Sequence, residues 1–304
     1  MLQTDYNKVY TSPAQEASRF QIFKDNLNLI KEHNDKYNRG LVSYKLGITP
    51  FADMNEDDFS TYSNKPQQKS PPDAKASASP KRHVFVAATK DWRDEQVITK
   101  VRDQTFSCAS SWAFAAAAAI ESNLAIENGR LYTLSPQNLI DCVNNEGVDT
   151  CKSGSVKNAF HYVRSKGIMT EAEYPYTAHQ DVCSFVSNKS VTNIVTYREV
   201  PSGSEEQLQE VVSDTGLVAA AIHATRHFFL YKGGHFYDTT CNSDVRRLNY
   251  AVLVVGYNYE ERNEYWILKN SMGKRWGIDG YMHLARNREN NCGIATAAYY
   301  PVFH

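Results

Sequence analysis

The alternation of hydrophobic and polar residues predicts a small helical segment at the N-terminus. Over residues 12–34, apolar side chains recur at helical spacing and form one face of an amphipathic helix, at Phe20, Phe23, Leu27 and Ile30. Ser12 can cap this helix and Pro13 suits its first turn. An extended piece around residues 42–46 follows, and then a second short helix that begins near Asn55.

This pattern stops at residues 61–82, which are rich in Pro, Ser, Lys and Gln and have no apolar period. Such a composition is typical of an exposed connector that is open to proteolysis. The connector divides a helical segment, about residues 1–60, from a larger body.

The body changes its periodicity near residue 190. Before that point the pattern is helical, with predicted helices at Trp112–Asn128, from Ser135-Pro136, and at Val156–Lys166. After it, strands are predicted at Val191–Tyr197, Leu217–Ile222, Leu248–Tyr257, Tyr265–Lys269 and Tyr281–Ala285. One half is therefore mainly helical and the other mainly β, and two such lobes form a cleft where they meet.

Composition narrows the possible functions. The chain has 304 residues, 42% of them hydrophobic, which is enough for a large core. A formal net charge of −1 gives no overall attraction to nucleic acid or to an anionic membrane. The longest apolar run, Trp112–Ile120, is too short to span a bilayer. The first ten residues do not resemble a secretion signal, so a secreted protein would have lost its signal before this segment.

The six cysteines are the strongest signal of cellular location. All lie in the last two-thirds of the chain, and no Cys-x-x-Cys pair suggests zinc. We interpret them as three disulfides formed in an oxidising compartment, although six cysteines allow 15 connectivities and the count alone does not choose among them.

Several segments, in order along the body, resemble the papain family of cysteine proteases, and cathepsin L-like members in particular. They are DQTFSCASSWAF (103–114), DCVNNEGVDTCKSGSVKNAFHYV (141–163), LNYAVLVVGY (248–257), YWILKNSMGKRWGIDGY (265–281) and CGIATAAYYPV (292–302). The resemblance implies an α+β, two-lobed fold with a helical lobe and an antiparallel, barrel-like β lobe. It places the peptidase-like domain at residues 89–304, with the lobes meeting near residue 190, and implies no cofactor or metal.

The N-terminal segment resembles the inhibitory propeptide of the same family. The long-helix motif is matched at Arg19, Phe23, Asn26, Ile30 and Asn34, with Gln15 where Glu is usual, and the following motif at Gly47, Phe51 and Asp53, with Thr49 where Asn is usual. The resemblance implies a zymogen with a propeptide at 1–60, a linker at 61–88, and a mature part that starts near Ala88–Asp91. The propeptide would lie through the cleft and block it.

The family's disulfide pattern implies a pairing of the six cysteines. The matching positions join Cys108 to Cys151, Cys142 to Cys183, and Cys241 to Cys292. The same resemblance, with the disulfides, implies a secreted or a lysosomal or vacuolar protein.

The residues that carry the family's chemistry are changed. The family uses a thiolate at a helix N-terminus beside a histidine, but Ser111 holds the nucleophile position and Tyr250 the histidine position. A hydroxyl is far less acidic than a thiol and needs a general base, and tyrosine is a poor proton shuttle near neutral pH. We therefore expect little or no peptidase activity.

The supporting positions are partly kept. Asn270 matches the residue that orients the histidine, and Gln104 matches the oxyanion residue, although the interval from Gln104 to Ser111 is one residue longer than in the family. Around the expected cleft stand Ala109, Ser153, Gly154, His223, Met272 and Trp276, where Met272 replaces a usual Trp and Ala109 and Ser153 replace usual glycines.

Several functions fit these features. The leading hypothesis is a non-catalytic homologue whose cleft binds its own propeptide, other peptides, proteases or protease inhibitors. The alternatives are an active endopeptidase with Ser111 as nucleophile and an unrecognised base such as His223, a zymogen trapped by an engineered Cys→Ser change, and a storage or structural protein.

Some of these residues also have purely structural interpretations. Ser111 can cap the following helix, Tyr250 can fill space beside Met272, and His223 can be a rim residue. Asn188 begins a glycosylation acceptor pattern that matters only in a secreted protein.

Overall fold

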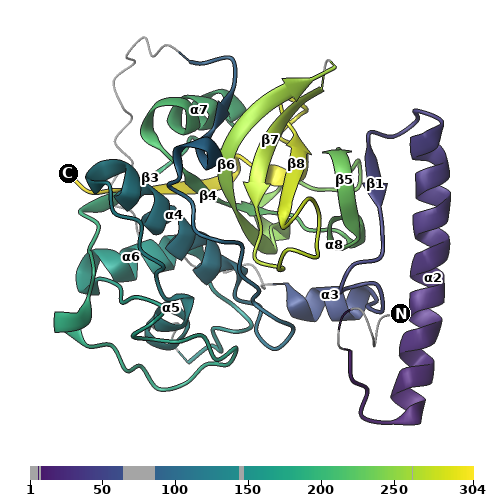
Figure 1. Ribbon diagram of the computed structural model, residues 1–304, viewed down its shortest axis with the longest axis horizontal. Helices are drawn as coiled ribbons and strands as arrows, with labels where there is room; N and C mark the ends of the chain where they lie inside the picture. The colour runs from purple at the N-terminus through teal and green to yellow at the C-terminus, as the bar shows by residue number, and fades with distance from the viewer. Residues whose placement is uncertain (1–5, 7, 64–85, 144–146, 262) are drawn as a thin grey trace.

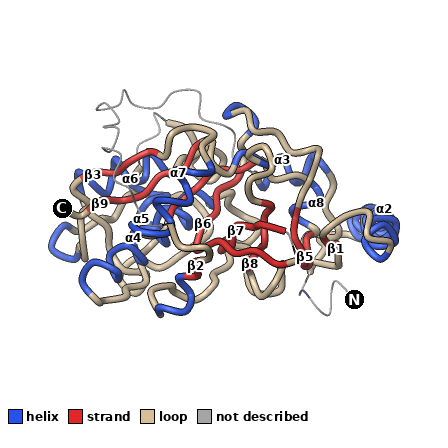
Figure 2. Tube along the Cα trace, turned by 90° about the horizontal axis from the view of Figure 1, so that it is seen from above, coloured by secondary structure: helices blue, strands red, loops and turns tan. Residues whose placement is uncertain are grey.

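A computed structural model describes residues 6, 8–63, 86–143, 147–261 and 263–304 (Figure 1). Residues 6–63 form an N-terminal part that stands along one side of a larger body, residues 86–304. In Figure 2 the long N-terminal helix lies at one end of the molecule, beside strands β1 and β5. The predicted linker lies almost wholly outside the described residues.

The N-terminal part is built on helix α2 (Pro13–Asn38). Ser12 caps it by accepting a hydrogen bond from the Gln15 backbone N at 3.2 Å. The helix runs four residues past its predicted end at residue 34, because the first glycine that can end it is Gly40. Helix α3 (Glu56–Tyr62) follows, and its start is fixed by a capping box between Asn55 and Asp58.

The helical half of the body confirms the predicted elements. Helix α4 (Ser111–Asn128) ends at Gly129, whose φ of 73° is left-handed, and it is buried along most of its length. Five consecutive alanines let it pack closely against strands β4 and β6. The other helices of this half are α5 (Pro136–Cys142) and α6 (Val156–Lys166). Two short helices that the sequence did not predict, α7 (Glu205–Glu210) and α8 (Arg226–Phe229), lie in the β half.

The β half is one sheet in the order β1-β5-β8-β7-β6-β4-β9-β3, with β2 also paired to β6. All neighbours are antiparallel except β5 and β8. The strands are β1 (Tyr44–Leu46), β2 (Lys90–Asp91), β3 (Thr196–Glu199), β4 (Val218–Ile222), β5 (Tyr231–Phe236), β6 (Tyr250–Glu260), β7 (Asn263–Lys269), β8 (Tyr281–Ala285) and β9 (Ala297–Val302). Short 3₁₀ turns lie at Trp92–Glu95, Ser187–Lys189, Val245–Arg247 and Asn291–Gly293, with one π turn at Val211–Thr215.

One predicted strand is wrong, and three strands, β2, β5 and β9, are missing from the prediction. Only the last two residues of the predicted strand at 191–197 belong to β3. In the earlier stretch Ile194 is buried but Asn193 and Val195 are exposed, and its only bridge in the described part of the chain joins Thr192 to Ile168. Strand β5 contains Gly233 and Gly234, and β9 contains Pro301, which are residues that argue against strands.

Three disulfides join Cys108 to Cys151, Cys142 to Cys183, and Cys241 to Cys292, which is the pairing that the family resemblance implied. All six cysteines lie in the described residues and none is free.

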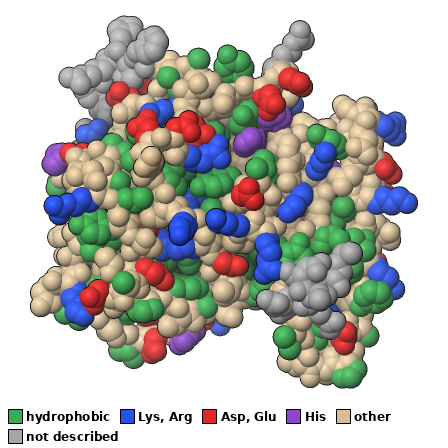
Figure 3. All heavy atoms as spheres, viewed as in Figure 1, with side chains coloured by type: hydrophobic (Ala, Val, Ile, Leu, Met, Phe, Trp, Pro, Cys, Tyr) green, Lys and Arg blue, Asp and Glu red, His purple; other side chains and the backbone are tan. Residues whose placement is uncertain are grey.

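Two further features concern the charges on the surface and the length of the helices. Acidic and basic side chains are interspersed on the face shown in Figure 3. Of the helices in the described part of the chain, none is long and apolar enough to cross a membrane.

Candidate functional site

Ser111 is the first residue of α4 and its side chain is almost fully buried. Its Oγ accepts a hydrogen bond from the backbone N of Ala251 at 3.1 Å, which joins the helix to strand β6. The suggestion that Ser111 caps α4 is wrong, since Ser110 holds the N-cap position and makes no side-chain capping bond. Ser110 Oγ instead lies 2.9 Å from the hydroxyl of Tyr176.

Tyr250 begins strand β6 next to Ala251, so the sheet itself brings position 250 beside the start of α4. Its side chain is 2% exposed, and its hydroxyl donates to Gln104 Oε1 at 3.0 Å. Burial raises the pKa of Tyr250 far above its ordinary value. The group at this position is therefore a neutral hydrogen-bond donor at every physiological pH.

Gln104 is fully buried, and its side-chain amide hydrogen-bonds to several residues of the site. Its Oε1 accepts both the Tyr250 hydroxyl and the Ser271 hydroxyl, the latter at 2.8 Å. Its Nε2 donates a long bond, 3.4 Å, to the carbonyl of Cys108. The amide thus binds three parts of the chain to one another.

Asn270 is buried and lies at the end of β7. Its Oδ1 accepts the backbone N of Ser271 at 2.8 Å, while its Nδ2 has no hydrogen-bond acceptor among the described residues. An unpaired buried amide group costs about 1–3 kcal/mol. The Nδ2 donor of Asn270 is therefore unused among the described residues, at the position where the family resemblance expects it to orient an imidazole.

The residues expected around the cleft are largely packing residues. A Cβ on Gly154 would lie 2.1 Å from the Trp112 ring, so a glycine there makes room for the indole. The backbone N of Ala109 donates to the Cys151 carbonyl at 2.9 Å, and the backbone N of Ser153 donates to the Asp149 carbonyl at 3.0 Å. Met272 is also buried.

Two further cleft candidates have hydrogen-bond partners of their own. Trp276 is fully buried and donates its Nε1 to the carbonyl of Phe228 at 3.0 Å. The ring of His223 accepts the backbone N of Asn242 at 2.9 Å, next to Cys241, and burial lowers its pKa. Its hydrogen bond therefore ties this imidazole to the loop after β5.

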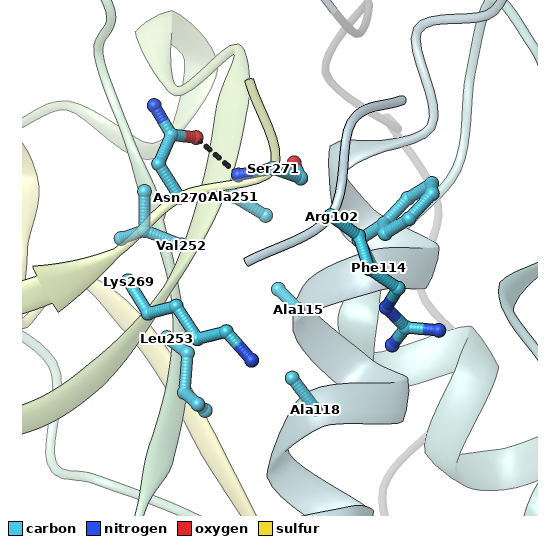
Figure 4. Close-up of a pocket in the computed structure, with 10 residues that line it drawn as sticks. All are labelled: Arg102, Phe114, Ala115, Ala118, Ala251, Val252, Leu253, Lys269, Asn270 and Ser271. Carbon is cyan, nitrogen blue, oxygen red and sulfur yellow. Dashed lines mark hydrogen bonds between the residues drawn. The ribbon is translucent and has the colours of Figure 1, made fainter. Parts of the chain in front are cut away.

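A cavity of about 20 Å³ lies beside Asn270, between α4 and strands β6 and β7 (Figure 4). This volume suits one water molecule and excludes a peptide side chain. The side chain of Lys269 points across it toward Ala115 and Ala118 on α4. Lys269 Nζ donates to the Thr99 carbonyl at 2.7 Å, and burial lowers its pKa to about 8.

Three residues that sequence reasoning missed belong to this site. The Tyr176 hydroxyl donates to the Gln104 carbonyl at 2.7 Å, and Ser271 shares the Gln104 amide. Tyr62, at the end of α3 in the N-terminal part, stacks on Tyr250 with ring centroids 6.4 Å apart and an interplanar angle of 18°. The sequence prediction placed Tyr62 in the exposed connector at 61–82, and this is wrong for residues 61 and 62, which belong to α3, where Tyr62 is buried.

Comparison with known families matches almost the whole chain. Residues 86–302 match the papain family of cysteine proteases, and residues 3–59 match the cathepsin propeptide inhibitor domain.

Individual relatives match over similar lengths. Cathepsin J of Mus musculus is 39% identical over 98% of this chain and 90% of its own length. Digestive cysteine proteinase 1 of Homarus americanus is 39% identical over 97% of this chain and 91% of its own length. The solved structure of digestive procathepsin L 3 from the Tenebrio molitor larval midgut superimposes with a TM-score of 0.89 at 44% identity, over 99% of this chain and 96% of the other.

Proposed function

Because this chain belongs to the papain family of cysteine proteases and carries a cathepsin propeptide inhibitor domain, we propose that it is a cathepsin L-like proenzyme homologue that does not hydrolyse peptides. The observation that carries the proposal is the pair Ser111 and Tyr250. These residues stand where the resemblance expects a nucleophilic cysteine and a catalytic histidine.

The chemistry of this pair argues against turnover. A serine hydroxyl must give its proton to a base as it attacks a carbonyl. The buried phenol of Tyr250 keeps its proton and donates a hydrogen bond to Gln104, so it cannot act as the general base. Loss of one member of a catalytic unit costs about a million-fold in turnover, and here both positions are replaced.

The retained fold supports a binding role. The disulfides, the helix that carries Ser111 and the strand that carries Tyr250 are all in place. We propose that the cleft of the mature part binds peptides, proteases or protease inhibitors. Three disulfides fit a secretory, lysosomal or vacuolar route.

We further propose the division 1–60 propeptide, 61–88 linker and 89–304 peptidase-like domain. Without its own activity, the chain relies on another protease to cut the linker. Self-cleavage of the purified chain in acid would contradict this.

The test of the proposed function is a fluorogenic peptide panel at acidic and neutral pH. The full chain, cut within residues 64–85 at an inserted protease site, freed of the added protease and diluted below the Kd of the N-terminal part, is compared with the double variant Ser111→Cys, Tyr250→His treated in the same way, and Ser111→Ala serves as the blank. We expect no turnover above the blank from the natural residues and measurable turnover from the double variant. Natural-residue turnover that Ser111→Ala abolishes would overturn the proposal.

A further inference from the structure

The N-terminal part and the body meet in a cluster of aromatic rings, which we call the aromatic clamp. Its members are Phe51, Phe59 and Tyr62 of the N-terminal part and Phe106, Phe228, Phe229 and Tyr250 of the body. Phe59 stacks on Phe229 with centroids 4.5 Å apart and an interplanar angle of 9°. Phe51 and Tyr62 each contact Phe229 too, at 5.4 and 5.8 Å.

Two rings of the clamp stand where this chain departs from the family's catalytic pattern. Tyr250 occupies the histidine position, and its ring lies between Tyr62 and Phe228, with centroids 6.4 and 5.4 Å away. Phe106 lies in the segment between Gln104 and Ser111 that is one residue longer than usual. Its ring contacts Phe51 at 5.2 Å and Tyr62 at 5.9 Å.

The backbone of the longer 104–111 segment places the Phe106 ring against the N-terminal part. Thr105 has a left-handed φ of 58°, and its backbone N is held by Asp103 Oδ1 at 2.8 Å. Lys8 of the N-terminal part lies 3.9 Å from the centroid of the Phe106 ring and pairs with Asp53 at 2.9 Å. The N-terminal part therefore contacts Phe106 with a cation as well as with rings.

From these contacts we propose that the changes at position 250 and in the 104–111 segment form a docking site for the N-terminal part, which stays bound after the linker is cut. The occupant is the segment from Phe51 to Tyr62 of the same chain. Rings in van der Waals contact at offset or edge geometries bind more strongly than their buried area alone gives. An imidazole at position 250 would be smaller and more strongly hydrated than the phenol, and would give Tyr62 less apolar surface to cover. This inference rests on the proposed function, because an active enzyme would digest the released segment.

The hydroxyl of Tyr62 is buried without a hydrogen-bond partner among the described residues. The ring, rather than the hydroxyl, is then the part of Tyr62 that holds the two regions together. Tyr62→Phe should keep the docking, and Tyr62→Ala should weaken it.

The experiment uses the full chain, cut at a protease site inserted within residues 64–85, with a fluorophore near the N-terminus. The anisotropy after dilution gives the Kd and the dissociation rate of the N-terminal part at one neutral pH. A double-mutant cycle compares Tyr62→Ala, Tyr250→His and the pair. We expect each single variant to raise Kd by roughly tenfold or more, and the pair to raise it by much less than the product of the two.

Matched variants keep the test decisive. Phe106→Ala, on a surface loop where folding is not at risk, should also raise Kd, whereas Phe20→Ala, on the exposed face of α2, should leave it unchanged. Multiplicative effects of Tyr62→Ala and Tyr250→His on Kd would overturn the inference. So would equal dissociation rates of the N-terminal part from the cut Phe106→Ala variant and from the cut parent. Fragmentation of the labelled segment, seen by intact mass, would instead overturn the proposed function.

Discussion

The N-terminal part contacts the body at two places with opposite chemistry. At the aromatic clamp the contacts are rings, and the tyrosines among them have pKa values raised by burial. At the other place, which we call the polar end, His33 and Tyr44 meet His227 and Asp238. The ring of His33 lies 5.2 Å from that of His227, and the Tyr44 hydroxyl lies 2.7 Å from His227 Nδ1. We therefore expect the first contact to be insensitive to pH over the physiological range and the second to depend on it.

The largest loss of stability is expected from a substitution at the centre of the aromatic clamp. Phe229 is fully buried and contacts Phe51, Phe59, Tyr62 and Tyr250. Phe229→Ala should lower the free energy of unfolding by about 3–5 kcal/mol, as measured by urea denaturation. Phe20→Ala, which removes an exposed ring, should stay within about 0.5 kcal/mol of the parent. Equal losses from the two variants would contradict a central role for the clamp.

Acidification should weaken the polar end alone. Burial lowers the pKa values of His33 and His227, so both rings are neutral in the docked state. Stability from these contacts is therefore present above about pH 6.5, the ordinary histidine pKa, and is lost as the pH falls toward the lowered values. Asp238, 3.9 Å from His227, and Glu56 oppose this loss, while Lys36 and Arg226 reinforce it.

The measurement is Kd of the cut N-terminal part between pH 7.5 and 4.5. It should rise by at most about tenfold per pH unit for each histidine that takes up a proton. His227→Gln should flatten the profile, and Tyr62→Phe should shift Kd little and leave the slope unchanged. A profile as steep with His227→Gln as without it would assign the pH dependence to other groups.

The smallest effect is expected from the ion pair between Lys8 and Asp53. Lys8→Met keeps an apolar contact with Phe106 but removes the cation and the pair, and should reduce the free energy of docking by about 1 kcal/mol. The loss should shrink when the measurement is repeated at high salt. An unchanged loss at high salt would mean that the Lys8 stem, and not its charge, makes the contact.

Local signals predicted the longer helices but missed the short α7 and α8. Long-range contacts account for most of the rest that the sequence could not predict. Ser12, Ser135 and Gly129 mark helix ends through bonds within a few residues, so those helices were found. Strands β5 and β9 exist because neighbouring strands pair with them, which overrides Gly233, Gly234 and Pro301.

The candidate site shows the same difference between features with a local sequence signal and features set by long-range contacts. The replacements at positions 111 and 250 could be identified by resemblance, because the motifs around them are intact. That Tyr250 stacks on Tyr62, 188 residues earlier in the chain, has no local signature. The same holds for Gln104, whose amide accepts two hydroxyls from different strands and loops.

Strand β1 of the N-terminal part is hydrogen-bonded to β5 and forms one end of the sheet. Gly234 allows this close approach, since a Cβ there would lie 2.6 Å from the carbonyl oxygen of Ser43. When the N-terminal part leaves, the backbone groups of β5 lose their partners and face water as an open edge. Unprotected edges recruit other extended chains, so the bare body should self-associate or capture a foreign strand.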